Sequence, residues 1–112
     1  MAYEQSLAAL SDPTRRSVFE AVAHSPSSVA VLARNLPVSR PAVSQHLKVL
    51  SDAGLVYARA EGTRRIYSVR AEGLAELRAY LDQFWDAVMQ GFAEDVHQME
   101  STAHDQSNHQ NN

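Results

Sequence analysis

Hydroxyl, amide and cationic side chains are concentrated in the stretch from Ser39 to Gly54. The stretch is predicted to be a helix, because Ser39 suits an N-cap, Pro41 suits the first turn and Gly54 suits the stop. One face offers hydroxyl, amide and cationic groups, which form hydrogen bonds with base edges and phosphates. The candidate recognition residues are Ser39, Arg40, Pro41, Ser44, Gln45 and Lys48.

The opposite face of this predicted helix is apolar. Val43, Leu47 and Leu50 are spaced i, i+4 and i+7, which places them on one buried stripe. The polar face has no acidic residue before Asp52, whereas an ordinary solvated face is rich in Glu as well as Lys. A surface helix with few acids is the alternative interpretation. His46 borders the stripe, so it either packs against a backbone group or contacts DNA.

The basic residues of the chain are confined to its middle. The net charge is −3, which by itself argues against a nucleic-acid partner. However, residues 39–70 contain six Lys and Arg against two acidic residues, whereas residues 71–112 contain one Arg against eight acidic residues. A local excess of cations beside the polar helix is what a DNA-binding surface requires.

Length and composition indicate one small domain. With 112 residues, 45% of them hydrophobic, the chain can bury only a modest core, so a dimer is plausible. The absence of cysteine excludes disulfides and thiolate metal sites.

The sequence contains no apolar run of about 18 residues and no N-terminal segment in which basic residues precede apolar ones. We therefore expect a cytoplasmic protein without membrane contact. No nucleophile–base pair, glycine-rich phosphate loop or carboxylate dyad is evident, so we do not expect an enzyme.

Three shorter helices precede the recognition stretch. Residues 2–11 are predicted to form the first, and residues 13–24 the second, with Asp12 as its N-cap. A third helix is predicted to be capped by Ser27 or Ser28 and to run to about Asn35. A short connection then leads into the polar helix, so the third helix and the polar helix together predict a helix-turn-helix.

After the polar helix, the spacing of apolar residues changes from the helical period to one typical of β-strands. Residues 55–60 and 64–70 are β-prone and flank a short glycine-containing turn, which predicts a hairpin. Arginines are concentrated at the tip of the hairpin. They either contact DNA or only prevent the exposed strand edge from pairing with another strand. The candidate wing residues are Arg59, Thr63, Arg64 and Arg65.

The helical period returns at Ala71 and lasts to about Met99. Such a helix is about 40 Å long, more than a small domain needs to cover itself. Its stripe of leucine and aromatic residues would be partly exposed in a monomer, which indicates a partner surface, unless the helix folds back over its own core. Residues 101–112 hold one apolar residue and are predicted to be a disordered polar tail after a domain of residues 1–100.

Four stretches, in this order, resemble the ArsR-type winged helix-turn-helix repressors. They are Leu10–Arg16, Ser39–Leu50, Ala53–Val56 and Gly62–Tyr67. The resemblance implies a mainly α fold with a small β-hairpin, in the order of four helices, two strands and a last helix. It also implies a recognition helix in the major groove, a wing at the minor groove or backbone, and repression of a small operon, often the protein's own.

The same resemblance implies a homodimer built on the first and last helices. A symmetric dimer spaces its recognition helices about one DNA turn apart, or a multiple of it, so the double-stranded operator is expected to be an imperfect palindrome. The side chains expected at the dimer interface are Tyr3, Leu7, Leu74, Leu77, Leu81, Phe84, Trp85 and Val88.

The chain departs from the metal-sensing members of that family at both of their sites. The helix before the recognition helix has no thiol, where the best-known site uses a pair of cysteines. The positions that match the second site hold Ala71, Gly73, Phe84 and Ala87, and none of these binds metal. We therefore expect DNA binding that depends on neither a metal nor another cofactor.

Two alternative functions come from the long helix. His97, Glu100 and His104 are spaced i, i+3 and i+7, so they would share a helical face and could hold zinc if the helix extends that far. The helix could also be the working surface of a protein-interaction module that has lost DNA binding. The basic middle segment argues against this second alternative.

Overall fold

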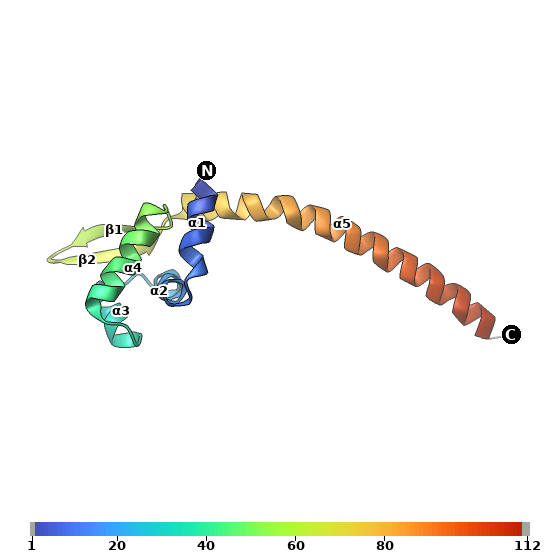
Figure 1. The fold of residues 1–112 in the computed structure, drawn as a ribbon, viewed down its shortest axis with the longest axis horizontal. Coiled ribbons are helices and arrows are strands. Elements are labelled where there is room, and N and C mark those ends of the chain that lie inside the picture. The colour runs from blue at the N-terminus through green and yellow to red at the C-terminus, as the bar shows by residue number, and fades with distance from the viewer. Residues whose placement is uncertain (1, 111–112) are drawn as a thin grey trace. The chain divides into compact units, whose positions relative to one another are not determined.

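A computed structural model describes the backbone of residues 2–110 and the side chains of residues 3–100. The chain divides into two compact units, residues 1–78 and 79–112. The first unit holds four helices, a two-stranded hairpin and the start of a fifth helix, which continues as the second unit (Figure 1). The bounds are α1 Ala2–Ser11, α2 Pro13–His24, α3 Val29–Asn35, α4 Arg40–Asp52, β1 Val56–Glu61, β2 Arg64–Val69 and α5 Ala71–Gln110.

This order of elements is that of a winged helix-turn-helix. Helices α3 and α4 form the helix-turn-helix, and the antiparallel strands β1 and β2 form the wing (Figure 1). The fold class expected from the sequence is therefore confirmed.

Side chains cap the starts of three helices. The capping oxygen accepts a backbone N–H in each case: Asp12 from Arg15 at 3.0 Å, Ser28 from Val31 at 3.3 Å, and Ser39 from Ala42 at 3.3 Å. The Arg15 N–H, donating to the Asp12 carboxylate, lowers the pKa of that carboxyl. The cap therefore stabilises α2 above the ordinary pKa of the acid, and this stabilisation is lost as the pH falls through the lowered pKa.

Two arginines of α2 bond to the end of α1. Nη1 of Arg15 donates to the carbonyl oxygen of Ala9 at 3.3 Å, and Nη1 of Arg16 donates to that of Leu10 at 3.0 Å. The last carbonyls of a helix lack partners within the helix, so these cations satisfy them and complement the helix dipole. The stretch from Asp12 to Arg16 thus fixes the corner between α1 and α2.

The core of the first unit combines residues from α2, α3, α4 and β1. The stripe predicted for α4 is confirmed, because Val43, Leu47 and Leu50 are fully buried. The other large side chains that are almost completely buried are Val18, Val22, Leu32, Leu55 and Val56.

The wing has a regular antiparallel register. It runs from the pair Val56 and Val69 to the pair Glu61 and Arg64. Gly62 in the turn has a φ of +65°, a conformation that favours glycine. Strand β1 begins and ends one residue later than the predicted first strand, because Glu61 still pairs with Arg64 before the chain turns.

A second contact attaches the wing to the helix-turn-helix. The N–H of Ser27 donates to the carbonyl of Tyr67 at 3.1 Å, and the N–H of Tyr67 donates to the carbonyl of Ser27 at 2.9 Å. This isolated bridge lies immediately before α3, whose N-cap is Ser28. Strand β2 is thereby hydrogen-bonded both to β1 and to the start of the helix-turn-helix.

The first turn of α5 packs backbone to backbone against the end of α4. A Cβ atom placed on Gly73 would overlap the carbonyl oxygen of Gly54, and Gly54 itself has a φ of +77°. The N–H of Arg70 donates to the carbonyl of Leu55 at 2.8 Å beside this contact. Glycine at position 73 is therefore required by the close approach of two chain segments.

Helix α5 is longer than the sequence pattern predicted. It continues past Met99 to Gln110, because no glycine or proline follows Gly91 to stop it. Its backbone is thus helical through most of the segment expected to be a disordered tail. The side chains of residues 101–112 lie outside the described part of the chain, and a domain boundary at residue 100 stays a prediction. No helix among the described residues is long and apolar enough to cross a membrane.

Replacement of Gly73 by alanine tests the close approach of α4 and α5. We expect Gly73→Ala to lower the free energy of unfolding by about 1–3 kcal/mol, because the new methyl group forces two backbones apart. Gly91→Ala is the matched control, since a Cβ there has no neighbour within 4 Å. Thermal unfolding of both variants at equal protein concentration makes the comparison. Equal stability of Gly73→Ala and wild type would contradict the packing described.

Candidate nucleic-acid interface

The polar face of α4 is exposed along its length. All six candidate recognition residues are exposed, namely Ser39, Arg40, Pro41, Ser44, Gln45 and Lys48. The buried leucines on the opposite face hold the helix against α2 and α3. The exposed groups include one amide, two hydroxyls and two cations, so the face can bond to both base edges and phosphates.

His46 lies at the edge between the two faces of α4. It is half-buried, and its Nδ1 atom is buried without a hydrogen bond to the residues that the structure describes. The packing predicted for this residue is present, but Nδ1 makes no bond to a backbone group. His46 also lies near enough to Asp12 to contribute weakly to the lowered pKa of that carboxyl, after the larger effect of the Arg15 amide.

The four candidate wing residues are also exposed. They are Arg59, Thr63, Arg64 and Arg65. Arg59 on β1 pairs with Ile66, and Arg64 begins β2 opposite Glu61. The bridge between Ser27 and Tyr67 fixes this hairpin to the start of α3, so the wing and the helix-turn-helix are held in one unit.

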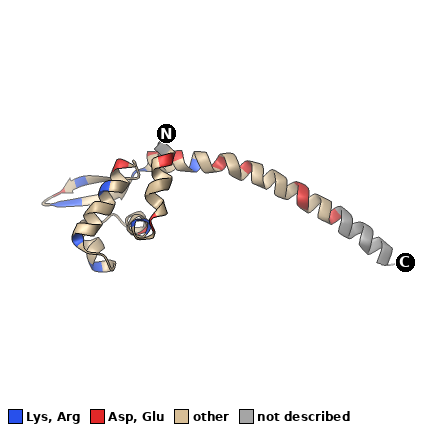
Figure 2. Cartoon of the chain, viewed as in Figure 1, with Lys and Arg blue, Asp and Glu red and all other residues tan. Residues whose placement is uncertain are grey.

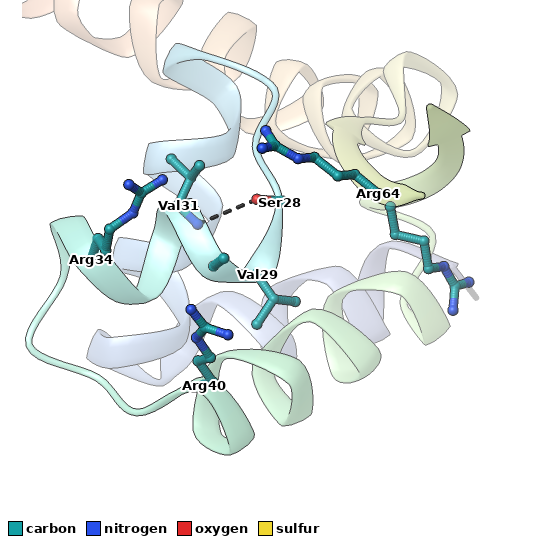
Figure 3. A pocket seen from close by; sticks show the side chains of 8 residues that line it. Ser28, Val29, Val31, Arg34, Arg40 and Arg64 are labelled. Atoms are coloured by element: carbon teal, nitrogen blue, oxygen red, sulfur yellow. Dashed lines mark hydrogen bonds between the residues drawn. The ribbon is translucent and has the colours of Figure 1, made fainter. Parts of the chain in front are cut away.

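A hollow lies where α3, α4 and the wing meet. Its volume is about 320 Å³, and Figure 3 shows the side chains around it. Four arginines from three elements line it, together with small apolar residues of α3; the full lining is Ser28, Val29, Ala30, Val31, Arg34, Arg40, Arg64 and Arg65. Arg34 was not among the residues selected from the sequence. The only sequence feature that pointed to Arg34 was its position just before the turn that leads to Arg40.

Positive charge gathers around this hollow and along α4. Figure 2 shows the Lys and Arg residues on α3, α4 and the wing, whereas acidic residues predominate on the described part of α5 beyond Ala79. No acidic residue lines the hollow. Within the first unit, the Lys and Arg residues of α3, α4 and the wing therefore accompany the exposed polar face of α4.

Comparison with known proteins agrees with this geometry. The helix-turn-helix domain family matches residues 10–56. The HTH-type transcriptional regulator Rv2034 of Mycobacterium tuberculosis is 57% identical over 86 residues, which cover 77% of this chain and 80% of that protein. The ArsR-like transcriptional regulator from Rhodococcus sp. RHA1 has a similar structure, with a TM-score of 0.70 and 30% identity over 81% of this chain and 89% of that one. The chain belongs to the ArsR family of winged helix-turn-helix transcriptional regulators.

A further neighbour shares the same architecture. The homodimeric winged helix-turn-helix DNA-binding domain from Mycobacterium bovis has a TM-score of 0.62 and 28% identity, over 76% of this chain and 79% of that one. As an ArsR-family protein, the chain is a DNA-binding transcriptional regulator and not an enzyme.

Large apolar side chains of this ArsR-family regulator are exposed on α5. Within the second unit, Trp85 is 62% exposed and Phe92 is 62% exposed, and the ring of Phe84 contacts that of Tyr80 edge to face at 5.0 Å between centroids. Besides Trp85, the exposed members of the predicted interface are Leu7, Leu74, Leu81, Phe84 and Val88.

Two residues of the predicted dimer interface are less accessible than expected. Leu77 is only 6% exposed, and Tyr3 is half-buried. Leu77 follows Gly73 by one helical turn, so it lies on the same face of α5 as the glycine that approaches Gly54. Leu77 is thus buried within its own chain, and its place in a dimer interface stays a prediction.

The sequence predicts no metal ligand at either of the two family sites. Ala71, Gly73, Phe84 and Ala87 occupy the positions matched to the second site, and the helix α3 has no cysteine. Among the described residues, no group of three His, Cys, Asp or Glu could hold a metal ion. His104 lies outside the residues whose side chains are described, so a zinc site formed by it with His97 and Glu100 stays a hypothesis.

Proposed function

We propose that this regulator is a homodimeric repressor that binds a specific, imperfectly palindromic operator, controls its own operon and needs no metal. The observation that carries the proposal is the exposed polar face of α4, held by a buried leucine stripe in the same unit as the arginine-rich wing. A helix of this kind fits the major groove, and a cationic hairpin beside it fits the neighbouring backbone or minor groove.

Within this proposal, Gln45 reads a base and the cations position the protein. A glutamine amide pairs bidentately with adenine, because its NH₂ group donates to N7 while its oxygen accepts from the N6 amine. Arg40 takes guanine or a phosphate, and Lys48 with the wing arginines takes phosphates. Repression follows when a bound dimer covers promoter DNA that RNA polymerase must occupy.

The variant Gln45→Ala tests the reading of bases. On duplexes selected by the wild-type protein from a random DNA pool, we expect a loss of about 1–3 kcal/mol in binding and relaxed preference at one base position in each half-site. Gln90→Ala, which shortens an exposed glutamine on α5, is the control and should keep the wild-type preference. An equal loss on selected and scrambled duplexes would show that Gln45 is not a reader.

The dimer is proposed to form through the exposed apolar side chains of α1 and α5. Supporting observations are the exposure of Trp85 and Phe84 and the homodimeric state of the similar domain from Mycobacterium bovis. Burial of these side chains against a second copy removes apolar surface from water, and the two-fold symmetry spaces two recognition helices for a palindrome.

The variant Trp85→Glu tests this interface. A carboxylate placed among apolar side chains is costly to bury, so we expect a monomer with weak operator affinity. Gln83→Glu adds the same charge two residues away on α5 and should remain a dimer. Sedimentation at micromolar concentration, followed by operator titration, measures both properties. A wild-type monomer under these conditions would refute the dimer.

Operator binding without metal is the last part of the proposal. We expect equal affinity in chelator and in stoichiometric zinc, because a ligand shifts binding only by its difference in affinity between the free and DNA-bound protein. The comparison uses gel shifts with the full chain and with a variant carrying both His97→Ala and His104→Ala. Release of the operator by zinc from the wild type, but not from the double variant, would instead establish a metal sensor that uses His97, Glu100 and His104.

A further inference from the structure

The four arginines that line the hollow do not stabilise the fold by their position, because their charges have the same sign. Arg34 of α3, Arg40 of α4, and Arg64 and Arg65 of β2 surround a volume of about 320 Å³ (Figure 3). Like charges brought together around one space repel each other, and the repulsion weakens only with solvent screening. An anion in the hollow would relieve this repulsion.

These four guanidinium groups have no partners in the described part of the chain. None of them makes an ion pair or a side-chain hydrogen bond with residues 3–100, in contrast to Arg15 and Arg16, which bond to the end of α1. Guanidinium groups present several N–H donors in a plane, which suits the oxygens of a phosphate. The hollow is therefore equipped with unused donors for a phosphate group.

The floor of the hollow is less polar than its rim. Val29, Ala30 and Val31 of α3 line it and are half-buried. A ligand that places a phosphate on the rim and an apolar face on this floor would match both parts. One sugar–phosphate unit of a nucleic-acid backbone has this composition.

We propose that the hollow holds one deoxyribose–phosphate unit of the DNA backbone, with Arg34 as a phosphate-binding residue. The inference rests on the proposed function. A phosphate backbone separates the major groove, where α4 binds, from the neighbouring groove, where the wing binds. A strand passing between the start of α4 and β2 must cross the hollow that these two elements line with α3.

Phosphate ethylation interference on a selected operator tests the assignment. With the wild type, ethylation of one or two adjacent phosphates in each half-site should block binding. With Arg34→Ala, we expect interference at those phosphates to disappear, base preference to remain, and the slope of log K against log salt to fall by about 1. Arg34→Lys should keep part of the salt slope, because a lysine retains the charge but lacks the planar donor fork.

Arg70→Ala is the matched control, because Arg70 is exposed in the same unit but does not line the hollow. It should leave the interference pattern unchanged. Thermal unfolding should place Arg34→Ala within about 0.5 kcal/mol of wild type, as for other surface substitutions. An unchanged interference pattern in Arg34→Ala, while Gln45→Ala still relaxes base preference, would overturn the hollow as a phosphate site and leave the proposed function intact. Failure of the wild type to bind any duplex would overturn both.

A free phosphate compound has the same chemistry as a backbone phosphate, and calorimetry with pyrophosphate separates the two sources. We expect pyrophosphate to bind the DNA-free full chain only in the millimolar range and to bind Arg34→Ala more weakly. Micromolar binding that displaces the operator from wild type and is lost in Arg34→Ala would reassign the hollow to a free phosphate ligand and overturn the backbone assignment.

Discussion

Main-chain contacts at the corner between α4 and β1 hold the recognition helix, the wing and the start of α5 together. The N–H of Leu55 donates to the carbonyl of Leu50 at 3.0 Å, and the carbonyl of Leu55 accepts from Arg70 at 2.8 Å. Gly54 turns the chain with a positive φ, and Gly73 lies against its carbonyl. Because backbone atoms make these contacts, the angle between α4 and the wing depends little on the exposed side chains of α4.

Stability and the proposed DNA contact therefore depend on different residues of the same helix. Leu47 and Leu50 are fully buried, and burial of a side chain of this size contributes about 1.5–3 kcal/mol. Gln45 and Lys48 are exposed and contribute little to that core. A helix built in this way can change its exposed side chains without loss of the fold.

Sequence patterns predicted only some of the contacts that the family motifs make in the structure. The caps of Asp12 and Ser39 were predicted from residue type and position, since an N-cap bonds to an amide only two or three residues away. The bonds from Arg15 and Arg16 to α1 were not predicted. They join residues six positions apart across a corner, and that geometry exists only after α1 and α2 have packed.

By itself the sequence determined the order of the helices and the hairpin and which face of α4 is apolar, because residue types within a few positions set each of these. It did not predict the continuation of α5 from Met99 to Gln110. Only the tertiary structure decided which distant residues share a site. Arg34, Arg40 and Arg64 meet at one hollow because Ser27 bonds to Tyr67 and because α3 packs on α4. Leu77, which was expected at the dimer interface, is only 6% exposed within its own chain. Periodicity describes one helix, whereas burial depends on the neighbours that the fold supplies.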